Sequence, residues 1–256
     1  MTKVLLTNDD GVHSPGIHAM AVALRDAGHD VMIVAPSGER SGWGAGVGTL
    51  LDGVEVEVTA HRVPDADDIV TWAVDGPPAF CVLTAMLETY GPRPELVASG
   101  INDGTNCGRG VLQSGTVGGA LIAQNFGLSA LAISQKVTDG PMLWETGAAV
   151  SVAAIDWLAE APRKTVLNVN VPNLALADLA GVRWGRLAAF GTTSTSLEGA
   201  VPGTLTVRVT PRDVELKPDT DTALVDAGYV AVTGLTGIRA ESEDSGPAAG
   251  FMEAAL

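Results

Sequence analysis

The chain has 256 residues, of which 46 % are hydrophobic, and this composition excludes a disordered polypeptide because it supplies enough apolar surface for a sizeable core. Its 30 acidic and 15 basic side chains give a net charge of −15, which argues against a protein that tracks a nucleic-acid polymer. No apolar run is long enough for a membrane span, and the two cysteines, Cys81 and Cys107, suit a reducing compartment. We therefore expect a cytoplasmic protein that acts on a small molecule and binds neither membranes nor nucleic acid.

The first half of the chain alternates short apolar runs with stretches of helical periodicity. Residues 4–6 and 31–34 are continuous apolar runs that predict buried parallel strands, and the apolar residues between them recur at helical spacing. The same alternation continues with strands expected at 96–98, 131–133 and 166–171 and helices at 79–89, 116–126 and 144–159. This rhythm predicts an α/β fold with a Rossmann-like three-layer core and a mostly parallel sheet, within residues 1–180.

Two further regions have the alternating pattern of half-exposed strands. Residues 46–75 alternate apolar with polar side chains around Val54, Val56 and Val58, which predicts a hairpin excursion from the core. After Pro172, alternating runs at 205–209 and 229–232 predict a C-terminal β-rich appendage and tail over residues 181–256.

Polar loops follow three of the expected strands, at the edge of a parallel sheet where ligands bind. The first contains the adjacent carboxylates Asp9 and Asp10 before Gly11, and a turn there would let both approach a hard divalent cation. An isolated motif of this kind is more often an ordinary turn with solvated carboxylates. The second loop, with Arg40 and Ser41 among glycines, has a pattern that flexible surface loops share.

The third loop is the longest and contains four glycines between residues 99 and 110, together with Asn102 and Asn106. It leads to Ser114, which begins the next expected helix, so that glycine-flanked backbone N–H groups would meet a helix N-terminus. This combination resembles a phosphate cradle, although a plain helix cap by Ser114 is the alternative. It lacks the Gly-Lys-Ser/Thr sequence of a Walker loop.

The three loops together supply only oxygen ligands, from Asp9, Asp10, Ser41 and Asn102. Oxygen ligands of this kind suit Mg²⁺ or Mn²⁺ better than Zn²⁺. A divalent ion beside a phosphate cradle activates water and stabilises a leaving oxygen, which predicts hydrolysis of a phosphate ester. In this hypothesis Asp10 or Asp9 accepts the proton of the attacking water.

At these residues the sequence resembles the SurE family, the survival-protein 5′/3′-nucleotidases. The matching blocks lie at residues 7–11 with 15–17, 35–42, 99–108 and 114–117, and later at 167–172, 220–221 and 228–230. The resemblance implies a phosphoric monoester hydrolase of the 5′-nucleotidase type, which releases phosphate from nucleoside monophosphates. It also implies one divalent ion per subunit, Mg²⁺ or Mn²⁺, at the positions of Asp9, Asp10, Ser41 and Asn102, with Asp9 and Asp10 as the catalytic residues.

The resemblance further implies a phosphate and substrate site and an oligomer. The site would be lined by Asn8, Asn106, Ser114, Gly115 and Thr116. A homodimer or homotetramer would form in part through exchange of C-terminal segments, which assigns oligomerisation to the appendage.

Several positions depart from the family pattern and leave alternatives open. Phe80 stands where the family usually carries a carboxylate, and Asp103 adds a negative charge beside the expected phosphate site. Trp43 is placed either to stack on a base or to pack internally. The alternatives to a nucleotidase are therefore a divergent phosphatase for a non-nucleotide ester, and a non-catalytic sensor that binds metal and nucleotide.

Overall fold

The computed structural model describes residues 1–48, 50–64, 66–189, 193–200, 202–211 and 215–239, so the expected tail from residue 240 onward lies outside the described residues. Its strands are β1 (Lys3–Thr7), β2 (Asp30–Pro36), β3 (Val58–Val63), β4 (Ala66–Val74), β5 (Leu96–Asp103), β6 (Ser129–Gln135), β7 (Val166–Val171), β8 (Gly181–Trp184), β9 (Thr193–Gly199), β10 (Leu205–Pro211) and β11 (Tyr229–Leu235). Its helices are α1 (Pro15–Asp26), α2 (Pro78–Met86), α3 (Gly115–Asn125), α4 (Trp144–Glu160) and α5 (Asp221–Asp226), with short 3-10 turns at Gly108–Leu112 and Leu176–Asp178.

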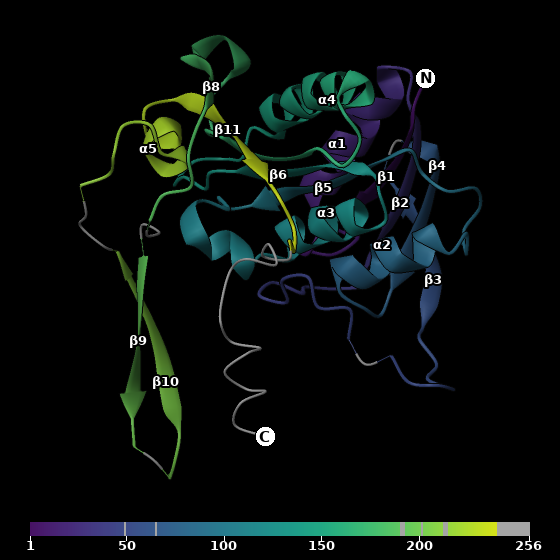
Figure 1. Ribbon diagram of the computed structural model, residues 1–256, viewed down its shortest axis with the longest axis horizontal. Coiled ribbons are helices and arrows are strands. Elements are labelled where there is room, and N and C mark those ends of the chain that lie inside the picture. Colours follow the sequence, from purple (N-terminus) through teal and green to yellow (C-terminus); the bar gives the residue numbers. More distant parts are fainter. Residues whose placement is uncertain (49, 65, 190–192, 201, 212–214, 240–256) are drawn as a thin grey trace, which may run out of the picture.

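One large sheet forms the centre of the molecule, and helices cover both of its faces (Figure 1). In the described residues its strand order is β3-β4-β2-β1-β5-β6-β7-β11-β8, and all neighbours from β4 to β7 are parallel. This confirms the expected α/β fold with a three-layer core and a mostly parallel sheet. Among the described residues, no helix combines the length and the apolar character needed to cross a bilayer.

Strand β1 shows why the apolar runs of the sequence are continuous rather than alternating. Val4 and Leu6 pack in the core cluster that includes side chains of α1 and α4, whereas Leu5 packs in the cluster beneath α2 and α3. All three side chains are completely buried. A strand covered on both faces needs apolar residues at every position, which is the pattern from which its burial was expected.

The excursion expected over residues 46–75 is a hairpin that joins the central sheet. Strands β3 and β4 pair antiparallel, and β4 also pairs in parallel with β2. Val54 and Val56 were expected in a strand but lie in a loop, because β3 begins only at Val58. Both valines are exposed, so their alternation with acidic residues buries nothing. The strand with buried positions is β4, which completes the sheet on that side.

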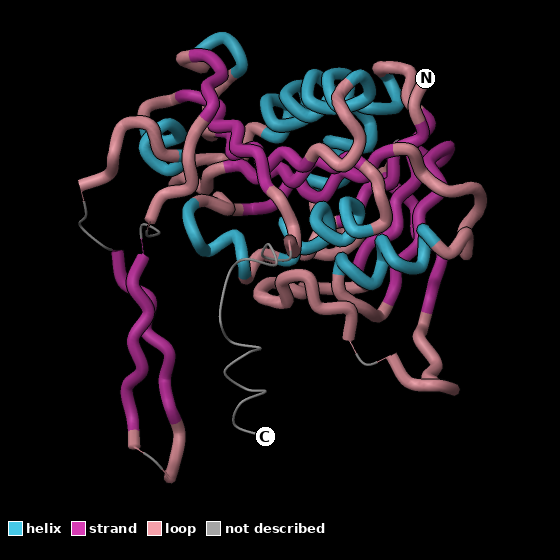
Figure 2. The backbone as a smooth tube through the Cα atoms, viewed as in Figure 1, coloured by secondary structure: helices cyan, strands magenta, loops and turns pink. Residues whose placement is uncertain are grey.

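The sheet also continues beyond residue 180, so the expected division at that residue falls within it. Strand β11 pairs antiparallel with β7, and β8 pairs in parallel with β11. Every residue of β7 is buried, and an edge position would expose its backbone groups to solvent. The part of the appendage that forms a separate sheet is the β9–β10 hairpin, which projects away from the body of the molecule (Figures 1 and 2).

The strand order reverses direction at β1, and this reversal positions the site. The chain places β2 and β4 on one side of β1 and then crosses to β5 on the other side. Open parallel sheets bind ligands at such a switch point, beyond the carboxyl ends of the strands. Asp9 and Asp10 lie in the loop that leaves β1, and Asn102 lies at the carboxyl end of β5.

Candidate metal and phosphate site

Asp9 is the centre of a cluster that joins three elements. It follows β1 directly, is 3 % exposed, and accepts a hydrogen bond from the hydroxyl of Thr116 in the first turn of α3. The same Thr116 oxygen lies 3.2 Å from Oδ1 of Asn102, which is on β5. One fully buried hydroxyl therefore lies against two of the expected metal ligands, which are far apart in the sequence, and it donates its single hydrogen to Asp9.

Gly115 provides the space that the Asp9 carboxylate occupies. A Cβ atom added at Gly115 would lie 2.8 Å from both Cβ and Oδ2 of Asp9, closer than side-chain atoms approach one another. Any side chain at this position would displace the carboxylate. Gly115 was expected from the sequence to line the phosphate site. The Asp9 carboxylate beside it also requires a glycine at this position.

Asp10 is a half-buried carboxylate beside a more deeply buried one. Burial, followed by the negative charge of Asp9, raises the pKa of Asp10 to about 7, against a hydrogen bond from the N–H of Asp103 at 3.4 Å. Burial also raises the pKa of Asp9, although the Thr116 hydroxyl opposes the shift. The charge of Glu39 acts on both carboxylates in the same direction. Two carboxylates in this setting are held ionised most effectively by a cation between them.

The donor chemistry of the cluster fits a hard divalent ion. Asn102 donates from Nδ2 to the carbonyl oxygen of Gly104 at 2.6 Å, which leaves its Oδ1 as the free oxygen. Two carboxylates with an amide oxygen are ligands that Mg²⁺ and Mn²⁺ accept. Over the residues that the structure describes, no group of three or more His, Cys, Asp or Glu side chains is arranged to hold a metal ion. The ligands expected from the sequence include only two carboxylates, so a site built from them is compatible with that finding.

Ser41 lies on the loop that follows β2, one residue after a backbone contact with Asp9. The N–H of Arg40 donates to the backbone carbonyl of Asp9 at 2.7 Å, which fixes the two loops against each other. Ser41 is exposed, and its N–H donates to Oε1 of Glu39 at 2.7 Å. Glu39 was not singled out from the sequence, although it belongs to the same loop motif.

Ser114 begins α3 as its N-cap. Its Oγ accepts a hydrogen bond from the N–H of Val117 at 3.1 Å, so the plain-cap alternative describes its oxygen correctly. A hydroxyl that accepts in this way still has its own hydrogen to donate. Asn8 is fully buried and closes the turn by donating from Nδ2 to the carbonyl oxygen of Gly11 at 2.9 Å. Asn8 therefore lies inside the first loop and stabilises its turn.

Asn106 is held by a network of amides that sequence analysis missed. Its N–H donates to Oδ1 of Asn170 at 2.8 Å, and its Nδ2 donates to Oγ of Ser134 at 2.8 Å. Its carbonyl oxygen accepts from Nδ2 of Asn168 at 2.8 Å and from Nδ2 of Asn170 at 3.1 Å. The available signal was the Leu-Asn-Val-Asn-Val run, which places two amides on one face of an otherwise apolar, buried strand.

Asp221 was also missed as a support for the third loop. It is completely buried and accepts hydrogen bonds from the N–H groups of Gly108 at 2.7 Å, Ala188 at 2.9 Å and Thr222 at 2.8 Å. Its carboxylate therefore fastens the glycine-rich loop to the start of α5.

The fold and the site together define a doubly wound α/β protein in which a buried carboxylate, a half-buried carboxylate and an amide oxygen meet a helix N-terminus at the switch point of the sheet. Such a site combines the ligands of a divalent cation with donors for a phosphate group.

Comparison with known proteins agrees with this class. The family described as Survival protein SurE matches residues 4–194. The chain is 39 % identical to the 5′/3′-nucleotidase SurE of Cronobacter sakazakii and 37 % identical to that of Erwinia tasmaniensis, in each case over 238 residues that cover 91 % of this chain and 89 % of the relative. The crystal structure of the SurE protein from Aquifex aeolicus matches with a TM-score of 0.77 and 31 % identity, over 98 % of this chain and 99 % of that one. The chain belongs to the SurE family, which confirms the resemblance seen in the sequence.

Proposed function

We propose that this protein is a metal-dependent phosphomonoesterase that hydrolyses nucleoside monophosphates to a nucleoside and phosphate, the activity for which its relatives are named 5′/3′-nucleotidase. The observation that carries the proposal is the convergence of Asp9, Asp10 and Asn102 beside the N-terminus of α3. Ionised carboxylates alone repel a phosphate group, so these side chains serve a phosphate ester only with a cation between them.

In this proposal one divalent ion per subunit, Mg²⁺ or Mn²⁺, is held by Asp9, Asp10, Ser41 and Asn102. When bound, such an ion polarises a phosphate oxygen and lowers the pKa of water. Thr116 orients Asp9 through its buried hydroxyl, and the bond from Nδ2 of Asn102 to the carbonyl oxygen of Gly104 orients Asn102. Asp10, the less buried of the two carboxylates, is the proton acceptor for the attacking water, and Asp9 supplies the fixed negative charge.

The phosphate group would bind at the start of α3. The Ser114 hydroxyl, the N–H of Gly115 and the Asn106 side chain are the donors that we assign to it, because a helix N-terminus favours an anion. Thr116 and Asn8 are fully buried, so we assign both to positioning: Thr116 to the ligand side chains and Asn8 to the first turn.

Phosphate release by the chelator-treated protein, before and after addition of Mn²⁺ or Mg²⁺, tests this function. Adenosine 5′-monophosphate and 4-nitrophenyl phosphate serve as substrates. We expect the nucleotide to be hydrolysed only when the ion is present. Hydrolysis of 4-nitrophenyl phosphate but not of adenosine 5′-monophosphate would indicate the divergent phosphatase instead. Metal binding without turnover of any ester would indicate a sensor.

We also propose a homodimer or homotetramer assembled in part through the β9–β10 hairpin. The register places Leu197 opposite Val207, with Leu205 and Val209 on the same face, and all four side chains are exposed. The other face carries the ion pair between Arg208 and Glu198. A two-stranded hairpin with one bare apolar face needs a partner in water, and a second copy of the chain supplies the same face.

Light scattering coupled to gel filtration measures the assembly directly. We expect an oligomer for the wild type and a smaller species for Val207→Asp, because the substitution places a charge in the buried interface. Thr206→Asp, on the opposite face of the same strand, is the matched control and should keep the wild-type mass. Equal masses for wild type and Val207→Asp would remove the hairpin from the interface.

Both cysteines are free thiols, in keeping with the cytoplasmic location that we propose.

A further inference from the structure

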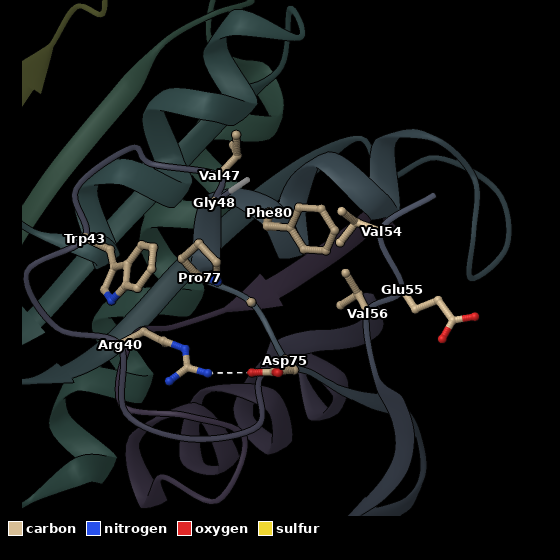
Figure 3. Close-up of a pocket in the computed structure, with 11 residues that line it drawn as sticks. Arg40, Trp43, Val47, Gly48, Val54, Glu55, Val56, Asp75, Pro77 and Phe80 are labelled. Carbon is tan, nitrogen blue, oxygen red and sulfur yellow. Dashed lines mark hydrogen bonds and ion pairs between the residues drawn. The ribbon is translucent and has the colours of Figure 1, made fainter. Parts of the chain in front are cut away.

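A cavity of about 390 Å³ lies between the loop that follows β2 and the start of α2 (Figure 3). Most of the side chains that line it are apolar, and two of them are aromatic, Trp43 and Phe80. In Figure 3 Pro77 lies between the two rings, and the ion pair of Arg40 with Asp75 borders the same space. A cavity of this size and character fits a small organic molecule.

Backbone contacts hold one wall of the cavity against the catalytic elements. The N–H of Arg40 donates to the carbonyl of Asp9 at 2.7 Å, and the N–H of Gly44 donates to the carbonyl of Gln113 at 3.1 Å. A Cβ atom on Gly118 would overlap the carbonyl oxygen of Gly44, so this loop packs directly on the first turns of α3. Trp43 lies in the loop between these two hydrogen-bonded residues, Arg40 and Gly44. This wall of the cavity therefore extends from the backbone of Asp9 to the N-terminus of α3.

Helix α2 provides the opposite wall and also packs against α3. A Cβ atom at Gly119 of α3 would lie 3.5 Å from Cβ of Pro78, the first residue of α2. Phe80 is the third residue of α2, lines the cavity and is partly exposed. Both aromatic side chains are thus carried by segments that contact the helix whose N-terminus we assign to phosphate.

The exposure and charge of the lining favour a flat, uncharged occupant. Trp43 is 50 % exposed, so part of its ring is free to contact a ligand in the cavity. The charge of Arg40 is neutralised by Asp75 at 2.6 Å, and Glu55 adds one further negative charge at the rim. Additional phosphate groups would therefore be repelled, whereas a neutral ring could cover the apolar surfaces of Trp43, Pro77 and Phe80.

We propose that this cavity binds the base of the nucleoside monophosphate, with Trp43 and Phe80 as its ring contacts. The inference rests on the proposed function, because it takes the phosphate to lie at the start of α3 and the ribose to span the distance to the cavity. The cavity then favours a nucleotide over a sugar phosphate that has no base to place there.

Selectivity between two phosphate esters tests the assignment. The measured quantity is the ratio of kcat/KM for adenosine 5′-monophosphate to kcat/KM for ribose 5-phosphate, with the Mn²⁺-loaded full chain. We expect Trp43→Ala to lower this ratio about tenfold, since one base–aromatic contact contributes that order of affinity. Phe80→Leu, which keeps an apolar side chain in the partly buried position, should lower it in the same direction. Trp157→Ala is the matched control, because Trp157 is 54 % exposed on α4 at the opposite face of the sheet, and its ratio should equal that of the wild type.

Adenosine binding, measured by calorimetry without phosphate or metal, separates failure of the inference from failure of the proposed function. Adenosine should bind the wild type and the Trp157→Ala variant but bind Trp43→Ala at least about fivefold more weakly. Turnover with an unchanged ratio in Trp43→Ala would overturn the base site and leave the nucleotidase standing. Absence of turnover on every ester would overturn the nucleotidase, and adenosine binding alone would then test the cavity. Weaker adenosine binding by Trp43→Ala than by the wild type would support the base site. Absence of adenosine binding to the wild type would overturn the base site.

Discussion

Asp9 and Asp221 are both buried carboxylates beside a helix start, yet their surroundings differ in kind. Asp221 accepts three backbone N–H groups, from Gly108, Ala188 and Thr222, and so has its charge compensated within the protein. Asp9 is held chiefly by the hydroxyl of Thr116 and has a second carboxylate, Asp10, as its neighbour. The number of N–H donors thus distinguishes a carboxylate that fastens two loops from one that is prepared for a cation.

The largest effect expected from this comparison is on the activity of Asp9→Asn. The amide has the same shape and still accepts from Thr116, but it removes the negative charge that the ion requires. Since changes to groups that merely support metal ligands cost about 10–100-fold, loss of a ligand charge should lower kcat/KM by more than about 100-fold. The melting temperature of the metal-free variant should not fall, because a buried charge has been removed. Turnover equal to that of the wild type would exclude Asp9 from the site.

The opposite outcome is expected for Asp221→Asn. The amide keeps one acceptor oxygen but turns an NH₂ group toward backbone donors, so the variant should lose about 2–3 kcal/mol of unfolding free energy in a urea titration. Its affinity for Mn²⁺ should stay close to that of the wild type. A variant that unfolds at the same urea concentration as the wild type, or that loses Mn²⁺ affinity without losing stability, would contradict the structural role of Asp221.

Metal binding should depend on pH in the direction set by Asp10. Burial and the charge of Asp9 raise the pKa of Asp10 to about 7, so protons compete with the ion below that pH. Mn²⁺ affinity should fall up to about tenfold between pH 7 and pH 6 by calorimetry. For the metal-free protein the sign is reversed: the raised pKa of Asp10 favours the folded state at low pH, so stability should decrease as the pH rises from about 4 to about 7 and change little above that. An affinity that is constant from pH 6 to pH 8 would show that Asp10 is already ionised without the ion.

The smallest effect concerns Cys107, which lies in the glycine-rich loop near Asp221. Burial, followed by the charge of Asp221, raises the pKa of the Cys107 thiol to about 12, and burial raises the pKa of Cys81 to about 12 as well. Neither thiol should react rapidly with an aromatic disulfide reagent at pH 8, whereas both should react after unfolding in guanidinium. A fast-reacting thiol in the folded protein would reopen a chemical role for Cys107.

Much of the fold could be predicted from periodicity. The continuous apolar runs at residues 4–6 and 166–171 indicated strands covered on both faces, and the structure confirms both. Residues 54–57 were wrongly predicted as part of a strand, because alternation predicts a strand only where one face has something to pack against. The pairing of β11 with β7 could not be read from the sequence, since partners in a sheet are decided by which buried edge lacks a neighbour.

The site could be predicted as a set of residues but not as an arrangement of roles. Asp9, Asp10 and Asn102 stood out because each follows a predicted strand, and the structure brings them close together at the ends of β1 and β5. Thr116 was expected to contact phosphate, whereas its hydroxyl is buried against the carboxylate. The amides of Asn168 and Asn170 went unnoticed as supports, because their importance depends on a loop more than sixty residues earlier in the chain.

The most direct test of the account is a crystal structure of the protein with Mn²⁺, in which anomalous scattering locates the ion. The account predicts one peak per subunit, within about 2.0–2.3 Å of oxygens from Asp9, Asp10 and Asn102. A peak elsewhere, or two carboxylates left without an ion at saturating Mn²⁺, would contradict it.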